Sequence, residues 1–369
     1  MRRFRSPLLW TFVTAVALLI AVGGWLLTDP LTSRSDALKT GGLAGSAVVA
    51  LYALWLNDRR RKVEERRQEV ERQRHELELQ RSDADRTRVA DERFAKAVEL
   101  LGNDADQVRV GALHALAGLA RNREEYRQTV LDVLCSYLRR PFHHPRYDLN
   151  EPDRRKREEK AGTPEQEREL QVRLTAQRLI TELLPPADDA TGISYNLDLT
   201  GAVTEYLDFS GRTIGELLLR YASLHSSTNF SGCRFTGDVY LTAAGTGSGR
   251  LIGDFRCREA IFEKHAWFSG TRFGRLADFT GTTFEGETSF KDAEFGGAAV
   301  FAEAVITGSL DLRRARFDDR TDLRFAEMPK NVSLHNTLAR PTKDVQLRDE
   351  WTLEQLSGGD SRIVPAGPM

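Results

Sequence analysis

Large apolar residues recur at steps of five and six through the C-terminal third of this 369-residue chain. Two positions before each of them stands a small residue, Ala or Thr, with Leu310 as the one exception. This period fits neither a helix nor an alternating strand, but it fits a chain that turns a corner after each unit. The anchors of the regular series are Phe262, Phe268, Phe273, Phe279, Phe284, Phe290, Phe295, Phe301, Ile306, Leu312, Phe317 and Leu323.

Four such units would close one square coil, and stacked coils would bury a continuous column of Phe and Leu. We therefore predict a repeat domain over residues 192–328. The pattern lapses at residues 242–253, where we expect a bulging loop, and the seven-residue step from Phe255 to Phe262 predicts an irregular corner. Residues 329–369 are expected to form a cap and a flexible tail, with a short helix over Val345–Leu356.

The repeat resembles that of the bacterial pentapeptide-repeat family, and the resemblance covers about residues 192–328. It implies a right-handed quadrilateral β-helix in which the anchors are structural. It also implies two properties of some family members as expectations. Solenoids of the family can dimerise end to end, which makes a homodimer one expected state, and some members mimic DNA and bind gyrase.

The N-terminal segment is strongly apolar. Leu8–Thr28 carries no charge and is long enough to cross a hydrocarbon core of about 30 Å as a helix. A shorter run rich in small residues follows, from about Ala37 or Gly41 to Leu56, so we expect a two-helix transmembrane hairpin over residues 1–57. Basic residues flank both outer ends of the hairpin, which predicts an integral protein of the bacterial plasma membrane with both termini in the cytoplasm and the lipid bilayer as one partner.

Residues 58–93 are almost entirely charged or polar and contain no Gly or Pro, which predicts a juxtamembrane helix. Val63, Val70, Leu77 and Ala84 recur every seven residues, but the matching second apolar position is filled by Arg or Gln. Two interpretations stay open. One is a solvated helix stiffened by Glu–Arg pairs, and the other is a weak dimeric coiled coil.

Residues 94–184 read as a helical domain that contains a charged loop at 141–168 with Pro145, Pro152 and Pro164. The region resembles the helical segment upstream of pentapeptide repeats in many bacterial proteins, on residues 93–102, 108–121 and 170–176. The predicted fold is therefore multidomain, with a transmembrane hairpin, an α-helical middle and a C-terminal solenoid.

No catalytic constellation stands out in the sequence. His143 and His144 are adjacent but have no placed third ligand, and the three Cys match no zinc-binding spacing. We expect no catalytic residue, no cofactor and no metal, and therefore no enzyme.

The favoured function is a membrane-anchored scaffold that presents the solenoid to an unknown protein partner. The first alternative is a gyrase-binding DNA mimic, but residues 192–328 hold 19 acidic and 15 basic residues, far from a polyanion, and we expect no nucleic acid as partner. The second alternative is an accessory subunit of an integral-membrane enzyme or transporter.

Overall fold

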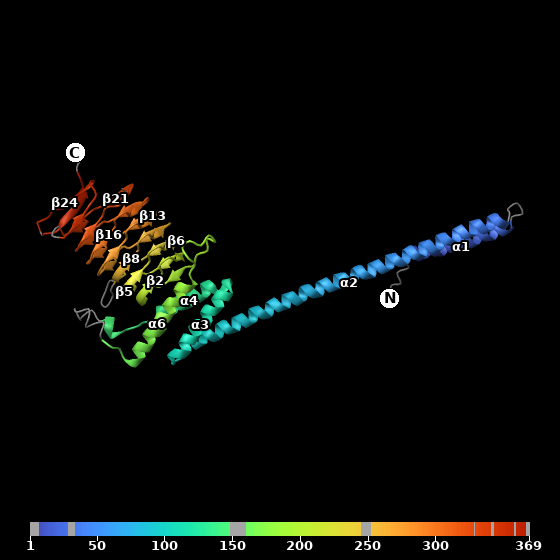
Figure 1. Ribbon diagram of the computed structural model, residues 1–369, viewed down its shortest axis with the longest axis horizontal. Coiled ribbons are helices and arrows are strands. Elements are labelled where there is room, and N and C mark those ends of the chain that lie inside the picture. Colours follow the sequence, from blue (N-terminus) through green and yellow to red (C-terminus); the bar gives the residue numbers. More distant parts are fainter. Residues whose placement is uncertain are drawn as a thin grey trace. The chain divides into compact units, whose positions relative to one another are not determined.

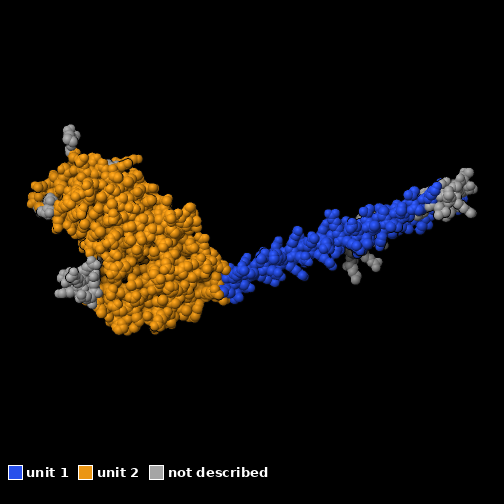
Figure 2. Space-filling view, in the orientation of Figure 1, with its two compact units in different colours: residues 1–89 blue, residues 90–369 orange. Residues whose placement is uncertain are grey.

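The computed structural model describes residues 7–28, 34–147, 160–244, 252–327, 329–340, 343–357 and 359–366 (Figure 1). The chain divides into two compact units, residues 1–89 and residues 90–369 (Figure 2). Most of the loop predicted at 242–253 lies outside the described residues, as does the centre of the charged loop at 141–168.

Unit 1 is a pair of helices. Helix α1 spans Pro7–Thr28, and helix α2 begins at Arg34 and continues to Leu100, beyond the end of the unit. The two helices contact each other through the rings of Phe12 and Tyr52, whose centroids lie 5.9 Å apart. No helix boundary occurs near residue 93, because nothing in the charged sequence interrupts the helical hydrogen bonds.

The transmembrane hairpin predicted over residues 1–57 is wrong. Among the helical residues that the structure describes, no helix is long and apolar enough to cross a membrane. A hairpin needs two spans, and the uncharged part of α2, between Lys39 and Asp58, is about 27 Å of helix, short of the roughly 30 Å required. The plasma-membrane location and the cytoplasmic termini were inferred from that hairpin, and both stay predictions.

The helical middle belongs to unit 2. It consists of α3 (Asp106–Asn122), η1 (Glu124–Tyr126), α4 (Arg127–Leu138), η2 (Pro145–Tyr147) and α6 (Pro164–Leu183). Helix α6 starts inside the predicted loop because Thr163 and Gln166 form a capping box. The Thr163 Oγ1 accepts a hydrogen bond from the Gln166 N–H, and the Gln166 side chain accepts one from the Thr163 N–H.

The rest of unit 2 is a β-solenoid (Figure 1). One face is a seven-stranded sheet of β1 (Leu197–Asp198), β4 (Leu217–Leu218), β7 (Val239–Tyr240), β10 (Ala266–Trp267), β14 (Thr288–Ser289), β18 (Ser309–Asp311) and β21 (Asn331–Ser333). A second face is a five-stranded sheet of β3 (Thr213–Ile214), β6 (Arg234–Phe235), β9 (Ile261–Phe262), β13 (Thr283–Phe284) and β17 (Val305–Ile306).

A thirteen-stranded sheet supplies the remaining faces. Its strands are β2 (Val203–Asp208), β5 (Ser223–Asn229), β8 (Ile252–Arg256), β11 (Arg272–Phe273), β12 (Ala277–Asp278), β15 (Glu294–Phe295), β16 (Ala299–Val300), β19 (Arg316–Phe317), β20 (Thr321–Asp322), β22 (Leu338–Ala339), β23 (Val345–Gln346), β24 (Trp351–Gln355) and β25 (Ser361–Pro365). Strand β8 pairs with both β11 and β12, so it continues around a corner and joins two faces.

The register shows that one regular coil holds four strands. Ala266 of β10 pairs in parallel with Thr288 of β14, 22 residues further on, and β11, β12 and β13 lie between them. Four units of five or six residues fill that length. The alternating step in the sequence therefore corresponds to the sides of one coil.

The solenoid extends past the predicted end at residue 328. Strands β21, β22 and β23 continue the parallel ladders to Gln346. The helix predicted over Val345–Leu356 is wrong, because β24 and β25 form an antiparallel hairpin there, and β25 adds to β22. The buried Trp351 of this hairpin packs edge-on against Phe325, so the cap covers apolar rings with a strand pair in place of a helix.

Candidate functional site

The twelve sequence anchors all lie in the core, and the most exposed of them retains 2% of its surface. Rings one coil apart stack nearly parallel, as with Phe279 on Phe301 at 4.7 Å between centroids and Phe273 on Phe295 at 4.9 Å. Rings from different sides of the coil are inclined to one another, at 45° between Phe279 and Phe284 and at 82° between Phe279 and Phe290. These twelve side chains form the core of the solenoid, and they are too deeply buried to contact a ligand at its surface.

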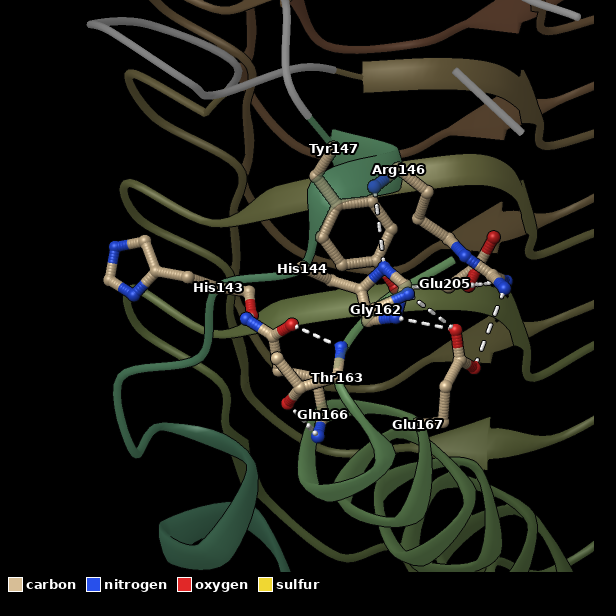
Figure 3. Close-up of polar contacts among 9 residues, drawn as sticks. All are labelled: His143, His144, Arg146, Tyr147, Gly162, Thr163, Gln166, Glu167 and Glu205. Atoms are coloured by element: carbon tan, nitrogen blue, oxygen red, sulfur yellow. Dashed lines mark hydrogen bonds and ion pairs between the residues drawn. The ribbon is translucent and has the colours of Figure 1, made fainter. Parts of the chain in front are cut away.

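A polar cluster joins the helical middle to the first coils (Figure 3). At its centre Glu205 of β2 is 4% exposed. Its carboxylate accepts hydrogen bonds from the Tyr147 hydroxyl at 2.9 Å and from the Ser226 hydroxyl at 2.9 Å, and Arg146 lies 3.4 Å away. A buried carboxylate is tolerated when charge and donors surround it in this way.

The His144 side chain belongs to the same cluster and is fully buried. Its Nδ1 accepts a hydrogen bond from the Arg146 N–H at 3.3 Å, which assigns the proton to Nε2, and Nε2 donates to Glu167 at 3.1 Å. Burial lowers the pKa of His144, and the Arg146 charge lowers it further. The ring is therefore held neutral by its surroundings.

The cluster functions as a clamp between two parts of unit 2. The Tyr147 ring stacks on His225 with centroids 3.9 Å apart, and burial together with Glu205 raises the Tyr147 pKa. His143 does not join His144, because its ring points away from the cluster (Figure 3). Among the described residues, no three His, Cys, Asp or Glu side chains are placed to hold a metal ion.

The outer face of the seven-stranded sheet carries an aromatic stack. The Arg220 guanidinium lies 4.3 Å from the centroid of the Tyr240 ring. The Trp267 ring stacks on Tyr240, with centroids 4.6 Å apart, and on His265, with centroids 4.8 Å apart. Our sequence reasoning missed this stack. The repeat pattern could have predicted it, because Trp267 directly follows the inward-facing Ala266 and its side chain must therefore face outward.

The C-terminal end of the same sheet is open. In each regular coil the N–H of the anchor donates to the coil that follows, as Phe290 does to the Asp311 oxygen and Leu312 to the Ser333 oxygen. The next members of this series are the N–H groups of Leu334 and Asn336. Neither has an acceptor among the residues that the structure describes.

A groove of about 520 Å³ lies at this open end. One wall is the last coil and the other is β25, which supplies a guanidinium from Arg362. The Arg362 Nε is buried and has no hydrogen-bond partner among the described residues. The groove is lined by Val332, Leu334, His335, Asn336, Arg362, Ile363, Val364 and Pro365.

Comparison with known families gives one match. A family model for pentapeptide repeats, described as nine copies, matches residues 254–294 and 279–327. This match supports the pentapeptide-repeat family. The β-solenoid of about six turns fits the pentapeptide-repeat fold, whose members are generally non-enzymatic structural or interaction proteins.

The match leaves the helical segments and the solenoid ends without a family assignment. No curated protein and no solved structure matches the chain. A pentapeptide-repeat solenoid suggests a protein-interaction scaffold, and the groove at the open end is a candidate site for such an interaction.

Proposed function

We propose that this chain is a non-enzymatic scaffold that binds a protein partner at the C-terminal end of its pentapeptide-repeat solenoid. An extended segment of the partner would add to the seven-stranded sheet beyond β21. Such strand addition uses main-chain hydrogen bonds for affinity and side-chain pockets for specificity. The unfinished ladder at Leu334 and Asn336 carries the proposal.

The lining of the groove indicates the chemistry of that segment. Val332, Leu334 and Val364 offer apolar contacts, and Arg362 offers a cation at the edge. Arg362 also pairs with Glu354 at 3.3 Å, but its Nε has no acceptor. A partner strand with an apolar side chain and a carboxylate fits these groups.

The gyrase alternative finds no support on the solenoid surface. Several acidic residues there are paired with arginines, as Asp311 is with Arg313 at 2.7 Å and Asp322 with Arg324 at 2.6 Å. A DNA mimic needs rows of unbalanced negative charge.

A displayed random-peptide library, selected on the full-length protein, tests the proposal. We expect enriched peptides with apolar and acidic residues, and Val332→Glu should weaken their binding by about tenfold or more because it places a charge in the apolar groove. Val305→Glu is the matched control, since Val305 is also a half-buried strand residue but lies on another face.

Hydrogen exchange provides a readout at the ladder itself. Peptide binding should protect the amides of the segment 331–337, because Leu334 and Asn336 gain acceptors. Equal binding to the wild type and to Val332→Glu, with both variants folded, would refute the site.

A further inference from the structure

The charged part of α2 carries an apolar stripe that nothing covers in the structure. Val63, Val70 and Leu77 are 47%, 48% and 52% exposed. They recur every seven residues on one continuous helix, which is the spacing of a coiled-coil seam. A stripe of this spacing drifts by only about 20° per heptad on a straight helix, and a left-handed supercoil around a partner helix removes that drift.

The identity of the flanking residues fixes the register. If the stripe occupies the first core position of each heptad, position a, the second core position, d, holds Arg66, Gln73 and Gln80. If the stripe occupied position d, position a would hold Arg67, Arg74, Arg81 and Arg88. An all-arginine core layer would repel itself, so the stripe is position a.

In this register the two positions that border the seam carry opposite charges. From Glu69 onward the g positions are acidic, Glu69, Glu76 and Asp83, and the e positions one heptad later are basic, Arg74, Arg81 and Arg88. The first g position, Lys62, is basic and lies at the end of the seam. In a parallel pair, each g residue faces the e residue of the next heptad on the other helix. Each acid would therefore meet an arginine, as Glu76 would meet Arg81 of the partner subunit.

The same pattern excludes the antiparallel arrangement. Antiparallel helices bring g positions opposite g positions and e positions opposite e positions, which would set acids against acids and arginines against arginines. The pattern is complementary to itself in the parallel orientation, so a second copy of this chain satisfies it without any other partner.

We propose that residues 63–88 of two copies pair as a parallel, in-register coiled coil. The seam joins Val63, Val70, Leu77 and Ala84 to their counterparts, while the polar d layer of Arg66, Gln73 and Gln80 keeps the association weak and selects partners through charge. The proposal is independent of the groove at the end of the solenoid.

Cysteine crosslinking of the full-length chain tests the geometry. The three native cysteines, Cys135, Cys233 and Cys257, are buried, so an introduced exposed cysteine is the reactive thiol. Leu77→Cys should form disulfide-linked dimers on mild oxidation, seen on a non-reducing gel. Ser82→Cys, on the outer f position of the same helix, is the control and should crosslink at least about fivefold less.

Orientation is read by mixing two variants. In a parallel in-register pair, Leu77→Cys and Val63→Cys each form homodimers and no mixed dimer, because the two positions lie about 21 Å apart along the helix. A mixed dimer that exceeds both homodimers would establish an antiparallel pair and overturn the proposal. Equal crosslinking at Leu77→Cys and Ser82→Cys, or none at either, would overturn it as well.

A charge swap gives a second, independent test. Glu76→Arg sets arginine against arginine in both g–e contacts, and we expect the Leu77→Cys crosslink to fall by about fivefold. Adding Arg81→Glu to the same chain restores the attraction and should restore the crosslink. Failure of the double variant to recover, with helicity unchanged by circular dichroism, would show that these charges do not specify the pair.

Discussion

At the residue scale the solenoid depends on single rings that have no room to move. Phe279 is fully buried, and six other phenylalanine rings lie around it with centroids 4.7–6.3 Å from its own. Packing of this kind is sensitive to the loss of even a few methylene groups, because neighbouring coils are joined by hydrogen bonds and cannot collapse into a gap.

Phe279→Ala should therefore lower the free energy of unfolding by about 3–5 kcal/mol, through lost burial and the cavity left behind. Denaturant unfolding followed by circular dichroism measures the change. Phe279→Leu keeps most of the volume and should cost clearly less. A cost below about 1 kcal/mol for the alanine variant would mean that the ring is not part of a rigid core.

The clamp at His144 makes a prediction about pH. The folded-state pKa lies below the ordinary value of 6.5, so the unfolded chain binds more protons as the pH falls through that value. Acidification from pH 7 to pH 5 should reduce the free energy of unfolding. The effect should be smaller in His144→Gln, which has no ring to protonate.

The groups that face His144 do not reverse this sign. Arg146 stays charged, Glu205 is bound by Tyr147 and Ser226, and the Glu167 pKa is lowered mainly by the Gly162 N–H. Glu167 therefore loses its contribution only as the pH falls below its ordinary value of 4.5. An unchanged slope in His144→Gln between pH 7 and pH 5 would locate the titrating group elsewhere.

At the element scale, the corners of the coil use glycine for two different reasons. Gly270 has φ +63° and open space around it, so glycine there relieves backbone strain. Gly286 has no such φ, but a Cβ would lie 2.4 Å from the Lys264 carbonyl oxygen of the preceding coil. The second position requires the close approach of two coils.

Alanine substitution separates these reasons. Gly270→Ala should lower the free energy of unfolding by about 1 kcal/mol, because alanine is strained in the left-handed backbone conformation. Gly286→Ala should cost more than about 2 kcal/mol, because a backbone must shift to relieve the clash. Thermal unfolding of both variants gives the comparison, and the reverse order would contradict the distinction.

At the scale of the whole molecule, the buried core lies within unit 2. It runs without interruption from Ala97 through the helices and coils to Ile363, and α6 packs on β2 while α4 packs on β1. None of the described residues before residue 90 is a member of this core.

A fragment of residues 90–369 should therefore unfold at the same denaturant midpoint as the full chain, within experimental error. Circular dichroism at a wavelength dominated by strand signal would follow the transition. A fragment with a clearly lower midpoint would show that the charged helix stabilises unit 2 beyond the core contacts. The same fragment should also be monomeric if the coiled coil holds two chains together.

The sequence predicted the repeat region through its anchors. A step of five and six with a small residue two positions earlier has few solutions, so burial of residues such as Phe290 could be predicted from spacing alone. The charged helix was equally accessible, since propensity decides a solvated helix. The end of the solenoid was missed, although Leu334 and Ala339 stand 22 residues after Leu312 and Phe317 and continue the parallel ladders.

Only the tertiary structure decided the cap, the clamp and the groove. Trp351 and Ile363 form a hairpin because β25 finds a free edge on β22, a contact between segments that no local pattern encodes. Glu205 meets Tyr147 across 58 residues, and the open N–H groups of Leu334 and Asn336 exist only because the ladder stops there. Periodic sequence thus determined the repeating interior, and the non-periodic ends were determined by which edges the folded coils left unpaired.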